Sequence, residues 1–443
     1  MKISTFFETD YVDHSSYDNI RKIASYTDGL KNSGRKVIYT ILKKNIKNDV
    51  KVSRLKSTVS ELTEYLHGED NLAGVIVGMA KRYVGTNNIP LLTAEGNFGK
   101  RLINEASADR YIFTSGETYL EKLFLKDDLP ILTKQIFEGE EIEPRFFTPI
   151  LPIILINGST DGISTGFAQK IYARPLNEIL KSTLEYIETG VFKAPKPNWR
   201  GFKGRVLKGE SHNKWKVYGV FERINSTQLK ITELPISYDL KKYKKVLNKL
   251  EEDGIIQDYK DRSSGENFNF TIKVTRKFSS LTDDEIYSKL KLIDSIYENY
   301  TCVNEHNKIS VFEKIEDVFY AYAKVREKAY ELRKQSLIDI KKETLKILAS
   351  KFIFVKSIIE EKIIVNDKNK QNIIDQIKNT KGITEKDGSY DFLLNMPIFS
   401  LTKEKKDSLY EEIIRTKEEL EIIENTSEKQ MWKNDISLLT NKN

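Results

Sequence analysis

The spacing of apolar residues changes twice along the chain and divides it into three regions. Up to about residue 128, apolar residues recur at helical spacing between glycine turns, and a basic helix is expected around Arg35–Lys47. Thr58 and Glu61 match a capping box, which predicts a helix beginning there and a second helix over 71–83. Two helices joined by a tight turn are typical of a helix-turn-helix unit.

Between Glu143 and Arg276 the apolar pattern takes the period of two that strands require. The clearest runs are Trp215, Val217, Gly219 and Phe221, and Phe268, Phe270, Ile272 and Val274. We therefore expect an α+β middle region.

After Asp283 the chain is charged and helical, and its apolar residues alternate at the spacings of four and three that mark a coiled-coil seam. One seam is Val318, Tyr322, Val325, Ala329 and Leu332, and the other is Leu409, Ile413, Thr416, Leu420 and Ile423. The segment 352–399 between them has apolar residues of its own. This pattern predicts two long antiparallel helices with a small helical domain at the tip, a shape that suggests a dimer arm.

The composition indicates a multidomain protein of the reducing cytoplasm. The 443 residues exceed what one core usually organises, and no apolar run approaches the roughly 20 residues of a membrane span. Acidic Glu8 and Asp10 precede any apolar stretch of signal-peptide length. Cys302 is the only cysteine, so it cannot form an internal disulfide, and the 4 histidines are too scattered for a structural zinc site.

The formal charge of +7 becomes informative where the charges cluster. Between Lys31 and Ser60, nine basic residues accompany a single acidic residue, Asp49. A basic helix ahead of a helix-turn-helix suits a polyanionic partner such as duplex DNA. An ordinary helical domain with a solvated basic face explains the same pattern equally well.

Three segments come close to nucleotide or metal sites without matching them. Residues 29–36 have the two glycines of a P-loop, but Arg35 and Lys36 replace its lysine and its Ser/Thr, and residues 96–100 fail likewise. The four glutamates within 138–143 have no fixed ligand geometry, so a solvated loop is the default interpretation.

Arg110 and Tyr111 form the most suggestive chemical pair. A tyrosine hydroxyl with a pKa of about 10 is a poor nucleophile, and a neighbouring guanidinium can favour the phenolate and neutralise a phosphate under attack. The chain has 22 tyrosines, and most Arg-Tyr neighbours are simply surface packing.

Several separated motifs supply the context that the pair lacks. They are Arg21 seven residues before Asp28-Gly29-Leu30-Lys31, then Arg35-Lys36, His67-Gly68-Glu69, Gly96-Asn97-Phe98-Gly99, Arg110-Tyr111-Ile112-Phe113-Thr114, Pro149-Ile150-Leu151-Pro152, Leu155-Ile156-Asn157-Gly158, and Phe392-Leu393-Leu394-Asn395-Met396-Pro397. On these motifs the chain resembles the DNA breakage-reunion part of the type IIA topoisomerases over nearly its whole length. It departs from the family's pattern at Gly34, Leu66 and Tyr172, which are positions of secondary DNA contacts.

The resemblance implies an α+β multidomain fold with five parts. These are a winged-helix DNA-binding domain with the catalytic tyrosine over 1–145, an α/β tower domain over 146–310, a long antiparallel coiled-coil arm over 311–350 and 400–428, a helical C-gate dimerisation tip over 351–399, and a C-terminal tail over 429–443.

The resemblance also implies roles for particular residues. Tyr111 would attack a backbone phosphate and stay joined to a 5′ end, Arg110 would stabilise the phosphorane charge, and His67 would hydrogen-bond the phosphate or the leaving oxygen. Ile171 would wedge between base pairs, and Asn97 would be a weaker DNA contact. The cations expected to hold the DNA backbone are Arg21, Lys31, Arg35 and Lys36.

Partners and cofactors follow from the same resemblance. The sequence shows no recognisable ATPase domain or acidic metal-binding domain of the family, so Mg²⁺ and ATP are expected on a partner chain, a topoisomerase large subunit. The chain resembles bacteriophage members in which breakage-reunion chemistry occupies a separate chain, which implies the host bacterial cytoplasm. Double-stranded DNA would be the substrate, two copies would form a homodimer through the C-gate, and no membrane association is expected.

Two other classes of protein are consistent with parts of the pattern. A noncatalytic dimer that binds and bends DNA would use the same fold with Tyr111 in a structural role. A tyrosine recombinase is disfavoured, because no second arginine and histidine set surrounds the tyrosine and the helical hairpin would have no role.

Overall fold

The computed structural model describes residues 3–366 and 368–440. The chain divides into two compact units, of which the first runs to Arg326 and resumes at Lys433, and the second is Glu327–Trp432. Residues 1, 2, 367 and 441–443, which belong to the predicted N-terminal domain, tip and tail, lie outside the described residues. None of the described helices is long and apolar enough to cross a membrane.

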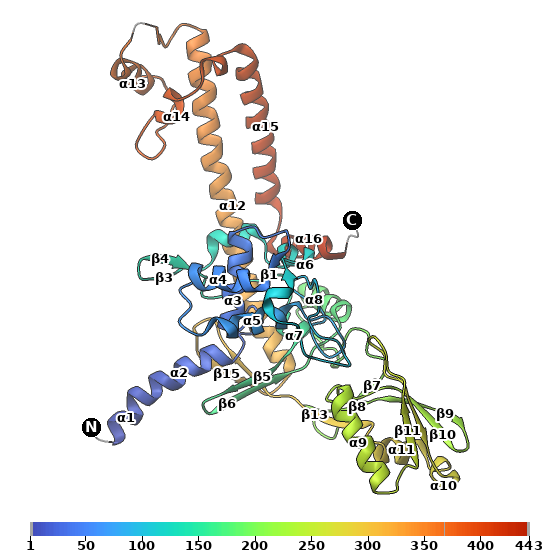
Figure 1. Ribbon diagram of the computed structural model, residues 1–443. Coiled ribbons are helices and arrows are strands. Elements are labelled where there is room, and N and C mark those ends of the chain that lie inside the picture. Colours follow the sequence, from blue (N-terminus) through green and yellow to red (C-terminus); the bar gives the residue numbers. More distant parts are fainter. Residues whose placement is uncertain (1–2, 367, 441–443) are drawn as a thin grey trace. The chain divides into compact units, whose positions relative to one another are not determined.

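The N-terminal part of the first unit is mainly helical (Figure 1). Its elements are α1 (Ile3–Glu8), α2 (Asp10–Lys22), α3 (Asn32–Lys43), β1 (Val50–Lys51), α4 (Val52–Leu62), α5 (Glu69–Ala80), η1 (Asp109–Tyr111), β2 (Phe113–Thr114), α6 (Thr118–Leu123) and η2 (Lys126–Ile131). Helices α3, α4 and α5 pack on one another through buried residues that include Ile38, Leu55 and Ile76.

The predicted helix start at Thr58 is wrong. Helix α4 begins at Val52, and the Thr58 hydroxyl donates to the Arg54 carbonyl oxygen (3.1 Å) inside the helix instead of capping it. Helix α5 begins at Glu69, directly after Gly68. The capping pattern failed because burial of Val52 and Leu55 favours a helix that begins earlier, and tertiary packing outweighs a local signal of about 1 kcal/mol.

Three hairpins and two helices follow in the first unit. They are β3 (Gln135–Phe137) with β4 (Glu140–Ile142), β5 (Ser159–Ser164) with β6 (Phe167–Ile171), β14 (Tyr300–Val303) with β15 (Ile309–Phe312), and the helices α7 (Ile153–Asn157) and α8 (Leu176–Thr189). Gly29 has φ +70, and a Cβ there would come within 2.5 Å of the Ile154 nitrogen. Only glycine therefore lets the Asp28-Gly29 turn pack onto α7.

The middle region contains two antiparallel sheets, and the α+β prediction is confirmed. One sheet has the order β11-β12-β10-β9 and the other β13-β8-β7. The elements are β7 (Arg205–Lys208), β8 (Lys214–Tyr218), β9 (Val220–Asn225), β10 (Gln228–Glu233), α9 (Leu240–Glu252), β11 (Asp258–Asp261), β12 (Phe270–Lys273), α10 (Arg276–Ser279), α11 (Asp283–Lys289) and β13 (Ile293–Tyr297). Alternate residues Phe268, Phe270, Ile272 and Val274 all enter one core, as their period of two predicts.

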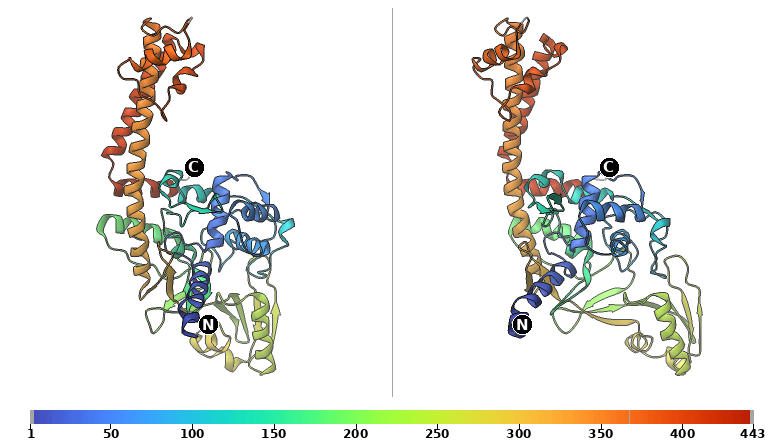
Figure 2. Two further views of the ribbon diagram at one scale, coloured as in Figure 1. Left: turned by 90° about the vertical axis from the view of Figure 1, so that its left-hand side faces the viewer. Right: turned by 60° about the vertical axis from the view of Figure 1, so that its left-hand side comes forward.

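The second unit contains most of a 45-residue helix, α12 (Ile315–Ile359). It continues with α13 (Lys370–Lys378), α14 (Asp391–Leu394), η3 (Ile398–Ser400) and α15 (Lys403–Asn425). Helices α12 and α15 run side by side in each view (Figure 1 and Figure 2), tied by ion pairs Lys341–Glu419 (2.5 Å) and Lys342–Glu424 (3.0 Å). A separate core that includes Phe354, Ile363, Ile377 and Leu393 holds the tip together, so the predicted helical hairpin with a helical tip is confirmed.

The predicted seam on α12 is only partly right. Val318 and Tyr322 belong to the first unit, where the Tyr322 hydroxyl donates to the Pro149 carbonyl oxygen (2.8 Å), and Leu332 is 46% exposed. The apolar spacing continued across the boundary between units because both ends of α12 bury one face. Residues 429–440, predicted within the tail, belong to helix α16 (Glu428–Thr440), in which Trp432 and Ile436 are buried.

Candidate functional site

Tyr111 lies on a short helical turn, η1, with its side chain in solvent. The residue is 65% exposed, and the guanidinium carbon of Arg110 lies 4.8 Å from the centre of its ring. The Tyr111 amide donates to the Ala108 carbonyl oxygen (2.9 Å), which closes the turn. The turn therefore presents a potential nucleophile and a cation together on the protein surface.

Strand pairing fixes the chain directly after this turn. The Val52 amide donates to the Ile112 carbonyl oxygen (3.0 Å), and Glu95 and Phe113 exchange both backbone hydrogen bonds (3.0 and 2.9 Å). Strand β1 continues the pairing through Lys51 opposite Phe113. Tyr111 thus stands at the edge of a rigid ladder, and a rigid element is the kind of support that a catalytic side chain requires.

The glycine turn at Gly96 packs against the backbone of Tyr111. Gly96 has φ +101, and a Cβ there would lie 3.0 Å from the Ile112 side chain and 3.6 Å from the Tyr111 carbonyl oxygen. Asn97 serves the same turn, because its side-chain oxygen accepts from the Gly99 amide (3.1 Å). The structure therefore gives Asn97 a structural role, and its predicted DNA contact stays a prediction.

His67 is held by two tyrosines at the end of the α4–α5 connection. The Tyr17 hydroxyl lies 2.7 Å from His67 Nε2, and the Tyr65 ring meets the imidazole edge-on with centroids 5.5 Å apart. Partial burial, together with the positive charge of Arg21, lowers the pKa of His67 below its usual value. The imidazole is therefore neutral at pH 7, with one ring nitrogen engaged by Tyr17.

A groove of about 560 Å³ contains two of the predicted DNA-binding cations. Arg21 forms no ion pair with any described residue, and Lys31 pairs with Asp161 (3.0 Å), whose side chain is 81% exposed. Their positive charge is thus available to a ligand phosphate at little desolvation cost. Other lining residues include Lys22, Tyr65, Asn71, Gly74, Gly78, Asn157 and Ser159.

Arg35 and Lys36 do not lie in the groove as free cations, which corrects their predicted role. The Arg35 guanidinium donates to both oxygens of buried Asp28 (2.7 and 3.2 Å), and Lys36 Nζ bonds Glu143 (2.9 Å) and the Thr63 carbonyl oxygen (2.6 Å). Burial raises the pKa of Glu143, and Lys36 opposes this shift. A phosphate contact by either cation would leave a buried carboxylate unpaired, which is strongly unfavourable.

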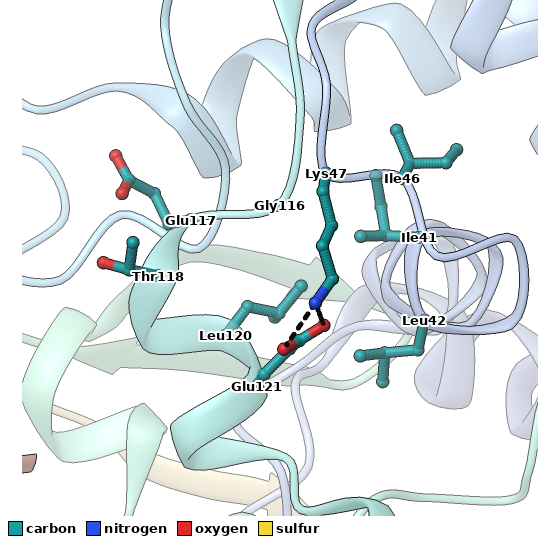
Figure 3. Close-up of a pocket in the computed structure, with 9 residues that line it drawn as sticks. All are labelled: Ile41, Leu42, Ile46, Lys47, Gly116, Glu117, Thr118, Leu120 and Glu121. Carbon is teal, nitrogen blue, oxygen red and sulfur yellow. Dashed lines mark hydrogen bonds and ion pairs between the residues drawn. The ribbon is translucent and has the colours of Figure 1, made fainter.

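Lys47 is another cation of the basic cluster that is paired within the protein, at a smaller pocket. Lys47 and Glu121 point toward one another across a pocket of about 280 Å³ between the end of α3 and α6, and form an ion pair of 3.1 Å (Figure 3). Of the nine clustered cations, several are therefore already paired within the protein. Charge counting along the sequence could not separate these from the free ones.

Ile171 is fully buried, so the structure contradicts its predicted role as a wedge. It ends β6 opposite Ser159, where the hairpin joins the body of the first unit. The exposed isoleucine of the same hairpin is Ile163, which is 75% exposed and lies near the turn at Gly166. Its place beside a Thr-Gly turn is a sequence signal that could have identified it.

Sequence reasoning also missed two residues that contact the predicted site. The Tyr17 hydroxyl bonds His67, and Lys56 pairs with Asp109, which directly precedes Arg110. Neither belongs to a motif, and only the fold brings them to the site.

Among the described residues, no group of three or more His, Cys, Asp or Glu is placed to hold a metal ion. In the glutamate-rich loop, Glu141 pairs with Lys134 (2.9 Å) and Glu143 with Lys36.

The fold, the exposed Arg110-Tyr111 pair and the cationic groove fit the type IIA topoisomerase class. The chain belongs to the family of the DNA gyrase/topoisomerase IV A subunits, whose model matches residues 21–437.

Similar proteins agree with this assignment. The mitochondrial DNA topoisomerase 2 of Dictyostelium discoideum is 32% identical over 98% of this chain and 34% of its own length, and DNA topoisomerase 2 of Invertebrate iridescent virus 6 is 32% identical over 98% and 38%. The chain thus spans about a third of the length of these curated relatives. The solved DNA-binding, cleavage and re-ligation domain of Plasmodium falciparum topoisomerase II has a TM-score of 0.90, 32% identity, and coverage of 98% of this chain and 63% of its own.

Proposed function

We propose that this chain is the DNA breakage-reunion subunit of an ATP-dependent type IIA topoisomerase and that Tyr111 is its nucleophile. One observation carries the proposal: a 65% exposed tyrosine with a guanidinium 4.8 Å from its ring, on a turn anchored by strand pairing. A nucleophile and a cation held on a fixed backbone suit attack on a phosphodiester, because position and charge are both prepared before the substrate binds.

The proposed reaction is a transesterification. The Tyr111 oxygen forms a bond to phosphorus while the bond from phosphorus to the 3′ oxygen breaks, so the protein becomes joined to the 5′ phosphate. The phenolic proton is released, and the leaving 3′ oxygen takes up a proton. Arg110 stabilises the charge of the phosphorane, and His67 hydrogen-bonds the phosphate or the leaving oxygen. Reversal by the 3′ hydroxyl reseals the strand after another duplex has passed.

We propose that the duplex lies along the groove that contains Arg21 and Lys31. Two glycines of α5, Gly74 and Gly78, leave open space where a side chain would stand, so a backbone phosphate can approach the helix closely. We assign the wedge between base pairs to Ile163 in place of Ile171, because an apolar side chain that is exposed on a hairpin can insert between bases.

The subdomain assignments are proposals of the same kind. The helices α3 to α5 with η1 act as the winged-helix domain, the two middle sheets with α9 to α11 act as the tower, and α12 with α15 form the arm. The tip core around Ile377 and Leu393 acts as the C-gate that joins two copies. Exposed Phe399 (79%) beside this core is the kind of apolar group that a dimer contact buries.

We propose that Mg²⁺ and ATP are bound by a partner chain, a topoisomerase large subunit. The near-misses to a P-loop at residues 29–36 and 96–100 support this division, because neither provides the lysine and hydroxyl that hold a nucleotide and its metal. The resemblance favours the medium subunit of a T-even bacteriophage topoisomerase, at work in the host bacterial cytoplasm. Purified chain should therefore show no ATP hydrolysis until the partner is added.

A noncatalytic DNA-bending dimer is the second candidate, since the groove and the exposed hairpin need no chemistry. The deciding experiment incubates the chain with its partner, supercoiled DNA and Mg²⁺, stops the reaction with detergent and looks for protein joined to 5′ ends. Tyr111→Phe should bind DNA normally and form no adduct, because it loses one oxygen and no charge. Adduct in this variant would show that another residue is the nucleophile. Absence of adduct in the wild type would favour the bending dimer.

A further inference from the structure

Lys56 connects the two parts of the candidate site through one ammonium group. It lies on α4, and its Nζ is 2.7 Å from a carboxylate oxygen of Asp109 and 2.8 Å from one of Asp70. Asp109 directly precedes Arg110, and Asp70 follows His67 by three residues. One side chain therefore contacts the sequence neighbours of both predicted catalytic segments.

The two ion pairs differ in their exposure to solvent. The side chains of Lys56 and Asp109 are 15% and 22% exposed, whereas Asp70 is 98% exposed. Water and salt screen an exposed pair, so the contact with Asp109 is the stronger tie. The hydrogen bond from Lys56 lowers the pKa of Asp109, so this carboxylate stays ionised at neutral pH.

The backbone leaves the turn that carries Tyr111 unsupported on one side. Ile112 and Phe113 pair with neighbouring strands, but before the turn the nearest backbone anchor is the Ser107 amide, which donates to the Asn97 carbonyl oxygen (2.9 Å). Between these anchors, Lys56 supplies a side-chain tie at Asp109. Helix α4 is itself a firm base, because Leu55 and Val59 are fully buried.

We infer that Lys56 is a positioning residue that fixes the turn of Arg110 and Tyr111 against the helices flanking His67. The inference rests on the proposed function, since it concerns the same site. Loss of the tie lets the turn move while its strands stay paired, so cleavage slows and DNA binding persists. A displacement of about 1 Å in reacting groups can cost on the order of a hundredfold in rate.

The test compares Lys56→Met, which keeps the length and removes the charge, with Lys56→Arg, which restores both ion pairs. In reconstituted complex with saturating DNA, Lys56→Met should lower the single-turnover cleavage rate about tenfold to a hundredfold. Its DNA affinity should stay within about twofold, and Lys56→Arg should recover most of the rate. Asp109→Asn should reproduce the loss, the double variant should be no slower than either single one, and Asp70→Asn should change the rate less than about twofold.

A second measurement does not depend on cleavage. Hydrogen exchange in the isolated chain should rise over residues 105–111 in Lys56→Met and stay unchanged over the buried part of α4. Wild-type cleavage rates in Lys56→Met would overturn the inference even if exchange rose. Failure of the wild type to form adduct would refute the proposed function separately, and unchanged exchange over 105–111 would refute the tie itself.

Discussion

The Tyr17 hydroxyl lies 2.7 Å from Nε2 of His67, so the N-terminal helix α2 holds the imidazole that is proposed for catalysis. Two residues that are 50 positions apart in the chain thus share one hydrogen bond. The position and protonation of the His67 imidazole therefore depend on α2. No motif of the sequence indicates this dependence.

We expect Arg21→Ala, on the same helix, to raise the pKa of His67 toward its ordinary value of 6.5, because the protonated ring no longer lies near a second positive charge. NMR titration of the imidazole measures this directly. A His67 midpoint that stays in place in Arg21→Ala would contradict the effect of the Arg21 charge on the imidazole.

The lowered pKa of His67 also predicts how stability depends on pH. The folded protein binds fewer protons at this site than the unfolded chain, so stability falls as the pH drops through about 6.5 toward the folded pKa. His67→Gln removes this contribution. Thermal unfolding between about pH 7.5 and pH 5.5 should therefore lose less stability in His67→Gln than in the wild type, and equal losses would contradict the shift.

Arg110→Ala should lower the cleavage rate by about a hundredfold to a thousandfold, since loss of one preformed donor to a transition-state oxyanion costs on the order of 3 kcal/mol. The side chain is exposed, so the unfolding temperature should not change. Single-turnover cleavage and calorimetry check the two expectations together. Arg110→Lys keeps the charge and so separates the effect of the charge from that of the guanidinium shape. A normal cleavage rate in Arg110→Ala would refute the assigned role.

Arg21→Ala and Lys31→Ala should each weaken DNA binding and reduce the slope of log affinity against log salt by about 0.9, as expected for one phosphate contact. Arg35→Ala is the matched contrast from the same motif. It leaves buried Asp28 without its partner and should cost about 3 to 5 kcal/mol of folding free energy. Salt titrations and denaturant unfolding distinguish the two kinds of cation, and an unchanged slope would remove Arg21 or Lys31 from the interface.

Ile163→Ala should reduce DNA bending, measured by fluorescence energy transfer between the duplex ends, with no loss of protein stability. Ile171→Ala, on the same hairpin, should instead destabilise the fold by about 2 to 5 kcal/mol, because it opens a cavity in a fully buried site. The pair separates a wedge from a core residue. Full bending by Ile163→Ala would leave the hairpin without the proposed role.

Replacing residues 351–397 by a short linker should remove the dimer contact while the reconstituted complex still nicks DNA. The tip has its own core, which includes Phe354 and Leu393, so its loss should spare the first unit. Sedimentation at low concentration measures the dimer, and detergent trapping measures the nick. A truncated chain that dimerises as tightly as the intact one would place the main contact elsewhere.

The sequence by itself determined most of the regular elements and the pair at the centre of the proposed site. The period of two at Phe270 and Ile272 and the seam at Leu409 and Thr416 report burial directly, because one face of a strand or helix must meet the core. Arg110 and Tyr111 are neighbours in the chain, so any fold keeps them together. These features depend on local spacing, which a sequence displays.

Only the tertiary structure decided which side chains are free to act. Arg35 and Lys36 have the same charge and the same motif as Lys31, yet they pair with the buried carboxylates of Asp28 and Glu143. Of the described residues, Lys31 pairs only with Asp161, whose side chain is exposed. Ile171 and Ile163 share a hairpin, and only their distance from the body of the first unit makes one core and the other exposed. Burial and pairing depend on long-range packing, so local patterns could not distinguish a cation that is exposed enough to meet DNA from one that stabilises the fold.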